Sequence, residues 1–411
     1  MSVAPSTVAS ALTPKASRAL GDALNDVPTV SAHRTQAAEA LNKSAMPSPS
    51  HDRPWKYVDP AALELDGFVP SLGTNPSTDN PTTIEGLSVT PFEEAGREGA
   101  LGRLGKAVAV NSNRISALHY AFLQNGLLVE TKPNTEVPEP VRLTREFNTA
   151  GALVTPHTLI VAGDNSRLSI IEEYRSCDEP LAALPVVELL VGPGAVVHYT
   201  SLHHWGTKTR VFSEQRAITE RDSAVRSLSL VTGGLLVKSH IASSLEGRGS
   251  SSELYGLSVG ASDEHIDFYT LQDHIAEDTR SDLLFKSALG DRSRAVYYGV
   301  TKVGLEGRRS DANQENRNLL LSRSAKADSD PVLEILTNDV ARVSHGATAG
   351  PVDEEELFYI QSRGLTREGA VELLVRGFLG EPLDRSALVE SVRQELNAVI
   401  EAKLQALGAE A

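Results

Sequence analysis

The stretch from residue 127 to residue 336 constrains the fold most, because short β-rich segments recur in it without an intervening helix. These segments are residues 127–129, 158–161, 168–172, 186–191, 195–200, 227–231, 235–241, 268–271 and 295–300. Turn residues such as Gly192-Pro193-Gly194 separate them. No helical pattern of ten or more residues lies between them, which argues against a doubly wound sheet. A sandwich, a barrel and a β-solenoid all remain open, and no strict repeat length decides among them.

Composition limits the partners and the compartment. The 411 residues carry a formal charge of -15, so nucleic acid and anionic membrane surfaces are poor partners. Cys177 is the single cysteine, which excludes an internal disulfide and any thiolate cluster made by this chain alone. The richest apolar stretch, residues 184–197, is interrupted too often to span a membrane, and no signal-peptide pattern opens the sequence. We therefore expect a cytoplasmic protein of two or three domains.

Three regions outside the β-rich middle differ from it. Residues 1–50 are rich in Ala, Ser, Thr and Pro, which predicts a low-complexity segment, partly disordered, with short helices that have little apolar face. Residues 51–126 predict a helical region, with helical spacing around residues 115–122. The last 60 residues predict helices, interrupted at Gly380-Glu381-Pro382. The final helix carries an apolar stripe from Leu388 to Leu407, which needs the neighbouring helix or another protein to cover it.

Several motifs near the C-terminal end are distinctive. They are Pro331-Val332-Leu333-Glu334-Ile335, Asn338-Asp339-Val340, Ser344-His345-Gly346-Ala347-Thr348, the acidic run from Asp353 to Tyr359, and Ser362-Arg363-Gly364. Upstream stand Ser310-Asp311-Ala312-Asn313-Gln314, residues 316–322 and Trp55-Lys56-Tyr57. Together these motifs make the chain resemble the SufB/SufD family of iron–sulfur cluster assembly scaffold proteins. The resemblance covers about residues 54–405 and is strongest after residue 290.

The resemblance implies a fold and partners. It implies a right-handed parallel β-helix core at residues 127–340, between an N-terminal helical region and a C-terminal helical domain at residues 341–411. It also implies a complex with a SufB-like subunit and a SufC-like ABC ATPase, the latter docked on the C-terminal helices. The chain holds no phosphate-binding loop, so ATP enters only through that partner. A reduced flavin, sometimes implied for the family, has no motif here, and the isolated chain can form a homodimer by pairing its β-helix edge with itself.

The resemblance also implies a type of subunit and one site residue. SufB-type chains rely on cysteine ligands, whereas no cysteine follows Cys177 here, which favours the SufD-type branch and a non-catalytic scaffold. His345 matches the SufD-type histidine at the interface with SufB, so it is the candidate iron or cluster ligand, shared with SufB. The alternative is a histidine that only hydrogen-bonds to order the passage from strand to helix. Many SufD-like chains carry a cysteine two residues earlier, where Val343 stands here.

Other candidates rank lower. His203 and His204 are adjacent on a predicted strand, where they face opposite ways and cannot easily share a metal. A denser cluster contains His265, His274 and nearby acids, namely Asp263, Glu264, Asp267 and Asp273. Those acids motivate the alternative function, a β-helix carbohydrate lyase or hydrolase with paired carboxylates. A third reading, a self-sufficient metal-binding protein, lacks H-x-x-x-H or H-x-H spacing.

Overall fold

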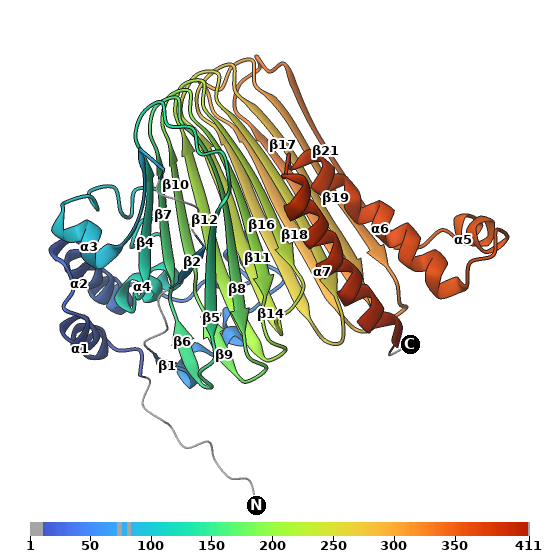
Figure 1. Cartoon of the computed structure of the whole chain (residues 1–411), viewed down its shortest axis with the longest axis horizontal. Coiled ribbons are helices and arrows are strands. Elements are labelled where there is room, and N and C mark those ends of the chain that lie inside the picture. Colours follow the sequence, from blue (N-terminus) through green and yellow to red (C-terminus); the bar gives the residue numbers. More distant parts are fainter. Residues whose placement is uncertain (1–10, 72–75, 80–83, 410–411) are drawn as a thin grey trace, which may run out of the picture.

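A computed structural model describes residues 11–71, 76–79 and 84–409 of the chain, and its centre is a parallel β-helix (Figure 1). The fold implied by the resemblance, a β-helix with helices at both ends, is confirmed. The strands of the β-helix are β4 Gly126–Thr131, β5 Val141–Phe147, β6 Ala152–Val154, β7 His157–Ala162, β8 Arg167–Ser176, β9 Leu181–Ala183, β10 Val186–Val191, β11 Val196–His204, β12 Thr209–Thr219, β13 Ala224–Val231, β14 Leu236–Leu245, β15 Ser251–Gly260, β16 His265–His274, β17 Arg280–Leu289, β18 Arg294–Val303, β19 Asp311–Leu320, β20 Lys326–Ile335 and β21 Arg342–Pro351.

The strands form two facing sheets, and from β10 onward the chain alternates between them. One sheet runs β3-β4-β7-β10-β12-β14-β16-β18-β20, and the other runs β2-β5-β8-β11-β13-β15-β17-β19-β21. In-register partners on successive turns lie 26 to 32 residues apart, as in the pairs Arg210–Leu236 and Arg294–Lys326. This variation explains why the sequence shows no strict repeat, although every turn of the solenoid has the same two-strand plan.

The interior of the β-helix combines apolar clusters with buried polar side chains along its length. Val129, Ile160 and Val197 belong to a buried apolar cluster in the first turns. Later turns place serines inside, and these hydroxyls pair across the interior, as Ser243 and Ser252 do at 2.8 Å, or along one sheet, as Ser258 and Ser287 do at 2.8 Å. Paired hydroxyls avoid the cost of a buried polar group without a partner, so a narrow polar interior is stable.

The N-terminal helices α1 Pro14–Leu24 and α2 Pro28–Lys43 pack beside α4 Arg114–Ala121 at the first turns of the β-helix (Figure 1). The prediction that they have little apolar face is wrong, because small side chains form it: Ala37 and Ala38 are buried with Leu41. The guanidinium of Arg34 adds hydrogen bonds to the carbonyl oxygens of Ala121 and Leu123, at 2.7 and 2.9 Å. The segment that we predicted as low-complexity and partly disordered also includes residues 1–10, which lie outside the described residues.

Residues 51–126 are less helical than predicted. Their described part contains α3 Phe92–Arg97 and α4, the short 3₁₀ helices η1 Arg53–Trp55, η2 Pro60–Leu63 and η3 Leu65–Gly67, and the strands β1 Val69–Pro70, β2 Ser77–Asp79 and β3 Leu87–Pro91. Trp55 packs on the outside of the β-helix, where its ring stacks on Phe212 at 5.1 Å. The Lys238 ammonium lies 5.0 Å from the same ring and donates to the Pro54 carbonyl at 2.6 Å. Packing against the sheet therefore replaces helical order in this segment.

The C-terminal helices are α5 Glu354–Gln361, α6 Arg367–Arg385 and α7 Glu390–Ala409. The apolar stripe of α7 is buried with outward side chains of the β-helix, including Leu228 and Leu257. The neighbouring helix α6 covers part of the stripe, as predicted, since its Val375 and Leu379 belong to the same cluster, and the chain's own β-helix covers the rest (Figure 1). Among the helices of the described residues, none is long and apolar enough to cross a membrane.

Helix α6 continues through Gly380-Glu381-Pro382, so the predicted interruption there is wrong. A proline inside a helix leaves the carbonyl four residues earlier without its usual donor. Here that carbonyl belongs to Phe378, and the buried Lys286 of β17 donates to it at 2.7 Å. The same ammonium forms an ion pair with Glu381 at 2.7 Å. A side chain of the β-helix therefore supplies the hydrogen bond that the helix lacks.

The C-terminal end of the β-helix is open. Strand β20 pairs only with β18, and β21 pairs only with β19, so both outer edges lack a neighbour among the described strands. The predicted boundary of the β-helix at residue 340 lies one strand too early, because β21 completes the last turn and α5 begins at Glu354.

Candidate functional site at the open end of the β-helix

His345 faces the interior of the β-helix. It pairs in register with Gln314 on the preceding turn, and partners in a parallel ladder point to the same side of the sheet. Gln314 is fully buried, and its Oε1 accepts a hydrogen bond from Thr301 of the opposite sheet at 2.9 Å. The imidazole of His345 therefore lies directly above the Gln314 side chain, one turn further toward the C-terminal end of the β-helix.

His345 is nevertheless exposed, because no further turn covers it. An open cavity of 410 Å³ lies here, lined by Asn313, Glu315, Asn316, Arg317 and residues 345–348. Within the described part of the chain, the ring makes no hydrogen bond or ion pair. The hydrogen-bonding reading of His345 predicts such a partner, so the geometry gives that reading no support.

The last interior layer below this end is polar. Asn316 Oδ1 accepts hydrogen bonds from Asn318 Nδ2 at 2.7 Å and from the Ser329 hydroxyl. Asn316 Nδ2 donates to the Phe285 carbonyl at 3.2 Å. These amides satisfy one another and close the apolar interior below them, so the end remains stable when it faces water.

The described residues do not form a metal site by themselves. They contain no group of three or more His, Cys, Asp or Glu side chains that could hold a metal ion. Val343 lies on the same face of β21 as His345 but offers no donor atom. Cys177 follows β8, several strands away in the order of the nine-stranded sheet. A neutral imidazole binds ferrous iron well, but one histidine is too few, so any further ligands must come from outside this set.

His203 and His204 face opposite ways, as predicted. His203 is buried and its Nδ1 accepts a hydrogen bond from Trp205 at 3.1 Å; burial lowers its pKa to about 3. His204 lies partly exposed on the other face, 2.8 Å from the Thr232 hydroxyl and 3.5 Å from Glu173. The two rings cannot bind one metal together.

The acid–histidine cluster is dispersed in the fold. His274 faces the interior, where its ring nitrogens contact the hydroxyls of Thr279 and Ser281, both at 2.8 Å. Each of the four acids has its own cation, in the pairs Asp263–Arg292, Glu264–Lys403, Asp267–Lys238 and Asp273–Lys302. No two of these carboxylates form a pair for acid–base work, which counts against the carbohydrate-enzyme alternative.

A buried polar centre that the sequence analysis missed attaches the N-terminal region to the β-helix. The carboxylate of Glu188 on β10 accepts hydrogen bonds from the backbone N–H groups of Gly105, Ala107 and Val108 at 2.8, 2.7 and 3.0 Å. It also lies 3.1 Å from His157. Burial acts to raise the pKa of Glu188, but the contact with His157 and the backbone hydrogen bonds outweigh it and hold that pKa below its ordinary value. The sequence did contain a signal for this centre, since Glu188 is the only charged residue in the apolar run 186–191.

Comparisons with known proteins agree with this architecture. The family model described as "SUF system FeS cluster assembly, SufBD core domain" matches residues 145–378. An iron–sulfur cluster assembly SufBD family protein of Mycobacterium tuberculosis is 30% identical over 310 residues, which are 74% of this chain and 77% of that protein. The Bacillus subtilis assembly proteins SufD and SufB are 28% and 25% identical, over 72% and 73% of this chain and 68% and 64% of their own lengths. The chain belongs to the SufBD family of iron–sulfur cluster assembly proteins.

Proposed function

We propose that this chain is a SufD-type, non-catalytic scaffold subunit of a cytoplasmic complex that assembles iron–sulfur clusters. The observation that carries the proposal is the exposed, interior-facing His345 at an open end of the β-helix. The lack of any cysteine after Cys177 supports the SufD-type assignment over the SufB-type one.

The open end supports pairing with a SufB-type chain. The outer edges of β20 and β21 offer backbone donors and acceptors that a strand of another chain can use. Exposed apolar side chains lie at the corner beside this end, with Leu305 70% and Leu336 57% exposed. Together these groups form a polar edge with an apolar flank, as expected of a surface that a partner covers.

The C-terminal helices support docking of a SufC-type ATPase, but on a different surface from the α7 stripe. Phe358 and Tyr359 of α5 are 74% and 58% exposed, and Leu365 and Leu373 are 41% and 51% exposed. We call these four residues the α5–α6 patch. Because α7 already packs on the β-helix, the patch is the apolar surface of this domain left for a partner. ATP hydrolysis would then take place entirely in that partner.

In the proposed complex, the iron–sulfur cluster is cargo that is built where the two β-helices meet. His345 would supply one nitrogen ligand, and cysteines of the SufB-type chain would supply the thiolates that this chain lacks. A homodimer of the isolated chain would bring two such histidines to one interface and no thiolate.

The test is to co-express the chain with its SufB-type and SufC-type partners and compare wild type, His345→Ala and His51→Ala. His51 is an exposed histidine of the N-terminal region and serves as the matched control. We expect all three complexes to form, with bound iron and sulfide lost only in His345→Ala, since losing a ligand costs at least about tenfold in metal affinity. If the His345→Ala complex does not assemble, the histidine is structural. If wild type binds neither partner, the SufD-type assignment is wrong.

A further inference from the structure

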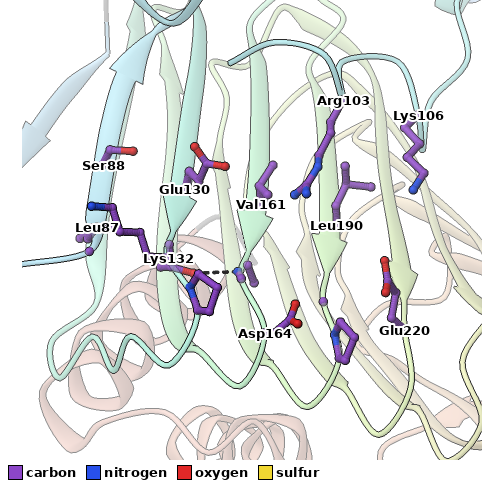
Figure 2. A pocket seen from close by; sticks show the side chains of 17 residues that line it. Leu87, Ser88, Arg103, Lys106, Glu130, Lys132, Val161, Asp164, Leu190 and Glu220 are labelled. Atoms are coloured by element: carbon purple, nitrogen blue, oxygen red, sulfur yellow. Dashed lines mark hydrogen bonds between the residues drawn. The ribbon is translucent and has the colours of Figure 1, made fainter. Parts of the chain in front are cut away.

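A groove of 680 Å³ lies at the N-terminal end of the β-helix, far from His345 in strand order (Figure 2). Its floor contains the apolar side chains of Leu87, Val161 and Leu190, from β3, β7 and β10. This volume lies in the range of sites that take small organic molecules. Neither the family comparison nor the proposed assembly role accounts for the groove.

Six charged side chains line the groove, and none of them is neutralised. They are the cations Arg103, Lys106 and Lys132 and the carboxylates Glu130, Asp164 and Glu220. Within the described residues, no side chain of these six forms an ion pair or a hydrogen bond. Charges on later turns behave differently, since Arg309 pairs with Asp278 at 2.6 Å and Arg248 pairs with Asp278 at 2.8 Å.

Four of the charges are arranged by sign. Figure 2 shows Arg103 and Lys106 extending from one loop, with Arg103 between Val161 and Leu190 in this view and Lys106 above Glu220. Asp164 lies just past the end of β7, and Glu220 lies just past the end of β12. Arg103 and Lys106 therefore lie along one wall and Asp164 and Glu220 along the opposite rim, with an apolar floor between them. Glu130 and Lys132 come from β4 and the turn after it, at the side of the groove.

We propose that this groove binds a small zwitterion of the short-peptide class, with its carboxylate on Arg103 and Lys106 and its ammonium on Asp164 and Glu220. Guanidinium and ammonium groups form their strongest hydrogen bonds with carboxylates, and carboxylates accept from ammonium groups in the same way. The balance of three cations and three carboxylates disfavours a phosphate, which the rim repels, and a metal cation, which the wall repels. An apolar side chain in the middle of the peptide covers Val161 and Leu190.

The probe is the tripeptide Gly-Leu-Gly, titrated calorimetrically into the full-length chain. N-acetyl-Gly-Leu-Gly lacks the ammonium, and Gly-Leu-Gly-amide lacks the carboxylate, so each tests one side of the groove. We expect saturable binding of the free tripeptide and at least about tenfold weaker binding of both blocked forms.

Paired variants assign each charge to its side. Arg103→Gln with Lys106→Gln should abolish the preference for the free carboxylate, and Asp164→Asn with Glu220→Gln should abolish the preference for the free ammonium. Lys15→Gln with Arg18→Gln removes two exposed cations of α1 and should leave binding unchanged. The proposal is overturned if the tripeptide gives no saturable heat, if blocked and free forms bind alike, if the groove variants bind as wild type does, or if pyrophosphate binds more tightly than the tripeptide.

Discussion

At the scale of single residues, the polar interior makes the stability of the β-helix depend on pH. Burial lowers the pKa of His274 to about 4, against 6.5 for an ordinary histidine, because the neutral ring contacts Thr279 and Ser281 in the interior. The unfolded chain then binds a proton at a pH where the folded chain does not. The stability from this group is complete above about pH 6.5 and is lost as the pH falls from there toward 4.

We therefore expect the free energy of unfolding to fall by about 2 kcal/mol between pH 7 and pH 5 on account of His274 alone. His274→Gln keeps a polar side chain without the titration, so its stability should fall less over this range. The measurement is urea unfolding of both proteins at the two pH values, with the exposed His51→Gln as the control. If the free energy of unfolding fell by the same amount between pH 7 and pH 5 in wild type and His274→Gln, His274 would not be the source of the pH dependence.

Lys286 is a second residue with a specific expected effect. Lys286→Met removes the donor of the Phe378 carbonyl and the partner of Glu381, so α6 should lose about 2 kcal/mol of local stability. Hydrogen exchange of the amides at residues 379–381 and 383–385 should become faster. Lys302→Met removes a more exposed ion pair with Asp273 and should have little effect. Unchanged exchange in α6 would show that another contact holds the helix through Pro382.

At the scale of elements, the sequence predicts the presence of an element better than what it packs against. The strands follow from β-branched and apolar runs such as residues 186–191. Their arrangement does not, because turns of 26 to 32 residues leave no exact period, and the motif resemblance was needed to choose the β-helix. The α7 stripe shows the same limit: Leu396 marks a buried face, but periodicity cannot say that the β-helix covers it. Likewise, Pro382 predicts that helix α6 is interrupted. The helix continues only because Lys286, distant in sequence, donates to the Phe378 carbonyl.

Helix α7 and the α5–α6 patch should respond differently to the same kind of change. Leu396 is fully buried, so Leu396→Ala should lower the free energy of unfolding by about 2–5 kcal/mol and loosen α7. Phe358 is mostly exposed, so Phe358→Ala should change stability by less than about 0.5 kcal/mol. Under the proposed function, only Phe358→Ala should weaken ATPase binding while the fold stays intact. Chemical unfolding and pull-down of the ATPase measure the two effects, and normal ATPase binding by Phe358→Ala would remove the patch from the interface.

At the scale of the whole molecule, the two ends of the β-helix differ in how they are protected. The N-terminal end is covered by α1, α2 and α4, and the Glu188 centre fixes the adjacent loop. The other end has a polar interior layer and two edges without a neighbouring strand in the described fold. A solenoid normally needs a cap at each end, so an uncapped end indicates a surface that another chain completes. The motif around His345 identified this residue as a candidate ligand. Its exposure could not be predicted, because it results from the position of β21 in the last turn of the β-helix.

This asymmetry leads to a prediction about assembly. Ala347 lies on the interior-facing side of β21, exposed beside His345. Ala347→Glu should leave the free energy of unfolding within about 0.5 kcal/mol of wild type, because the carboxylate faces water in the isolated chain. In a complex covered at this end, the same charge would be buried without a partner, so association with the SufB-type chain should weaken at least about tenfold.

Sedimentation equilibrium of the mixed chains measures this association, with Ala19→Glu on the exposed face of α1 as a control of equal charge change. Association of Ala347→Glu at wild-type strength would mean that the partner binds elsewhere. His345 would then face solvent in the complex, and the shared-ligand proposal would fail together with the interface. Weakened association with intact folding would instead tie the histidine and the interface to the same surface.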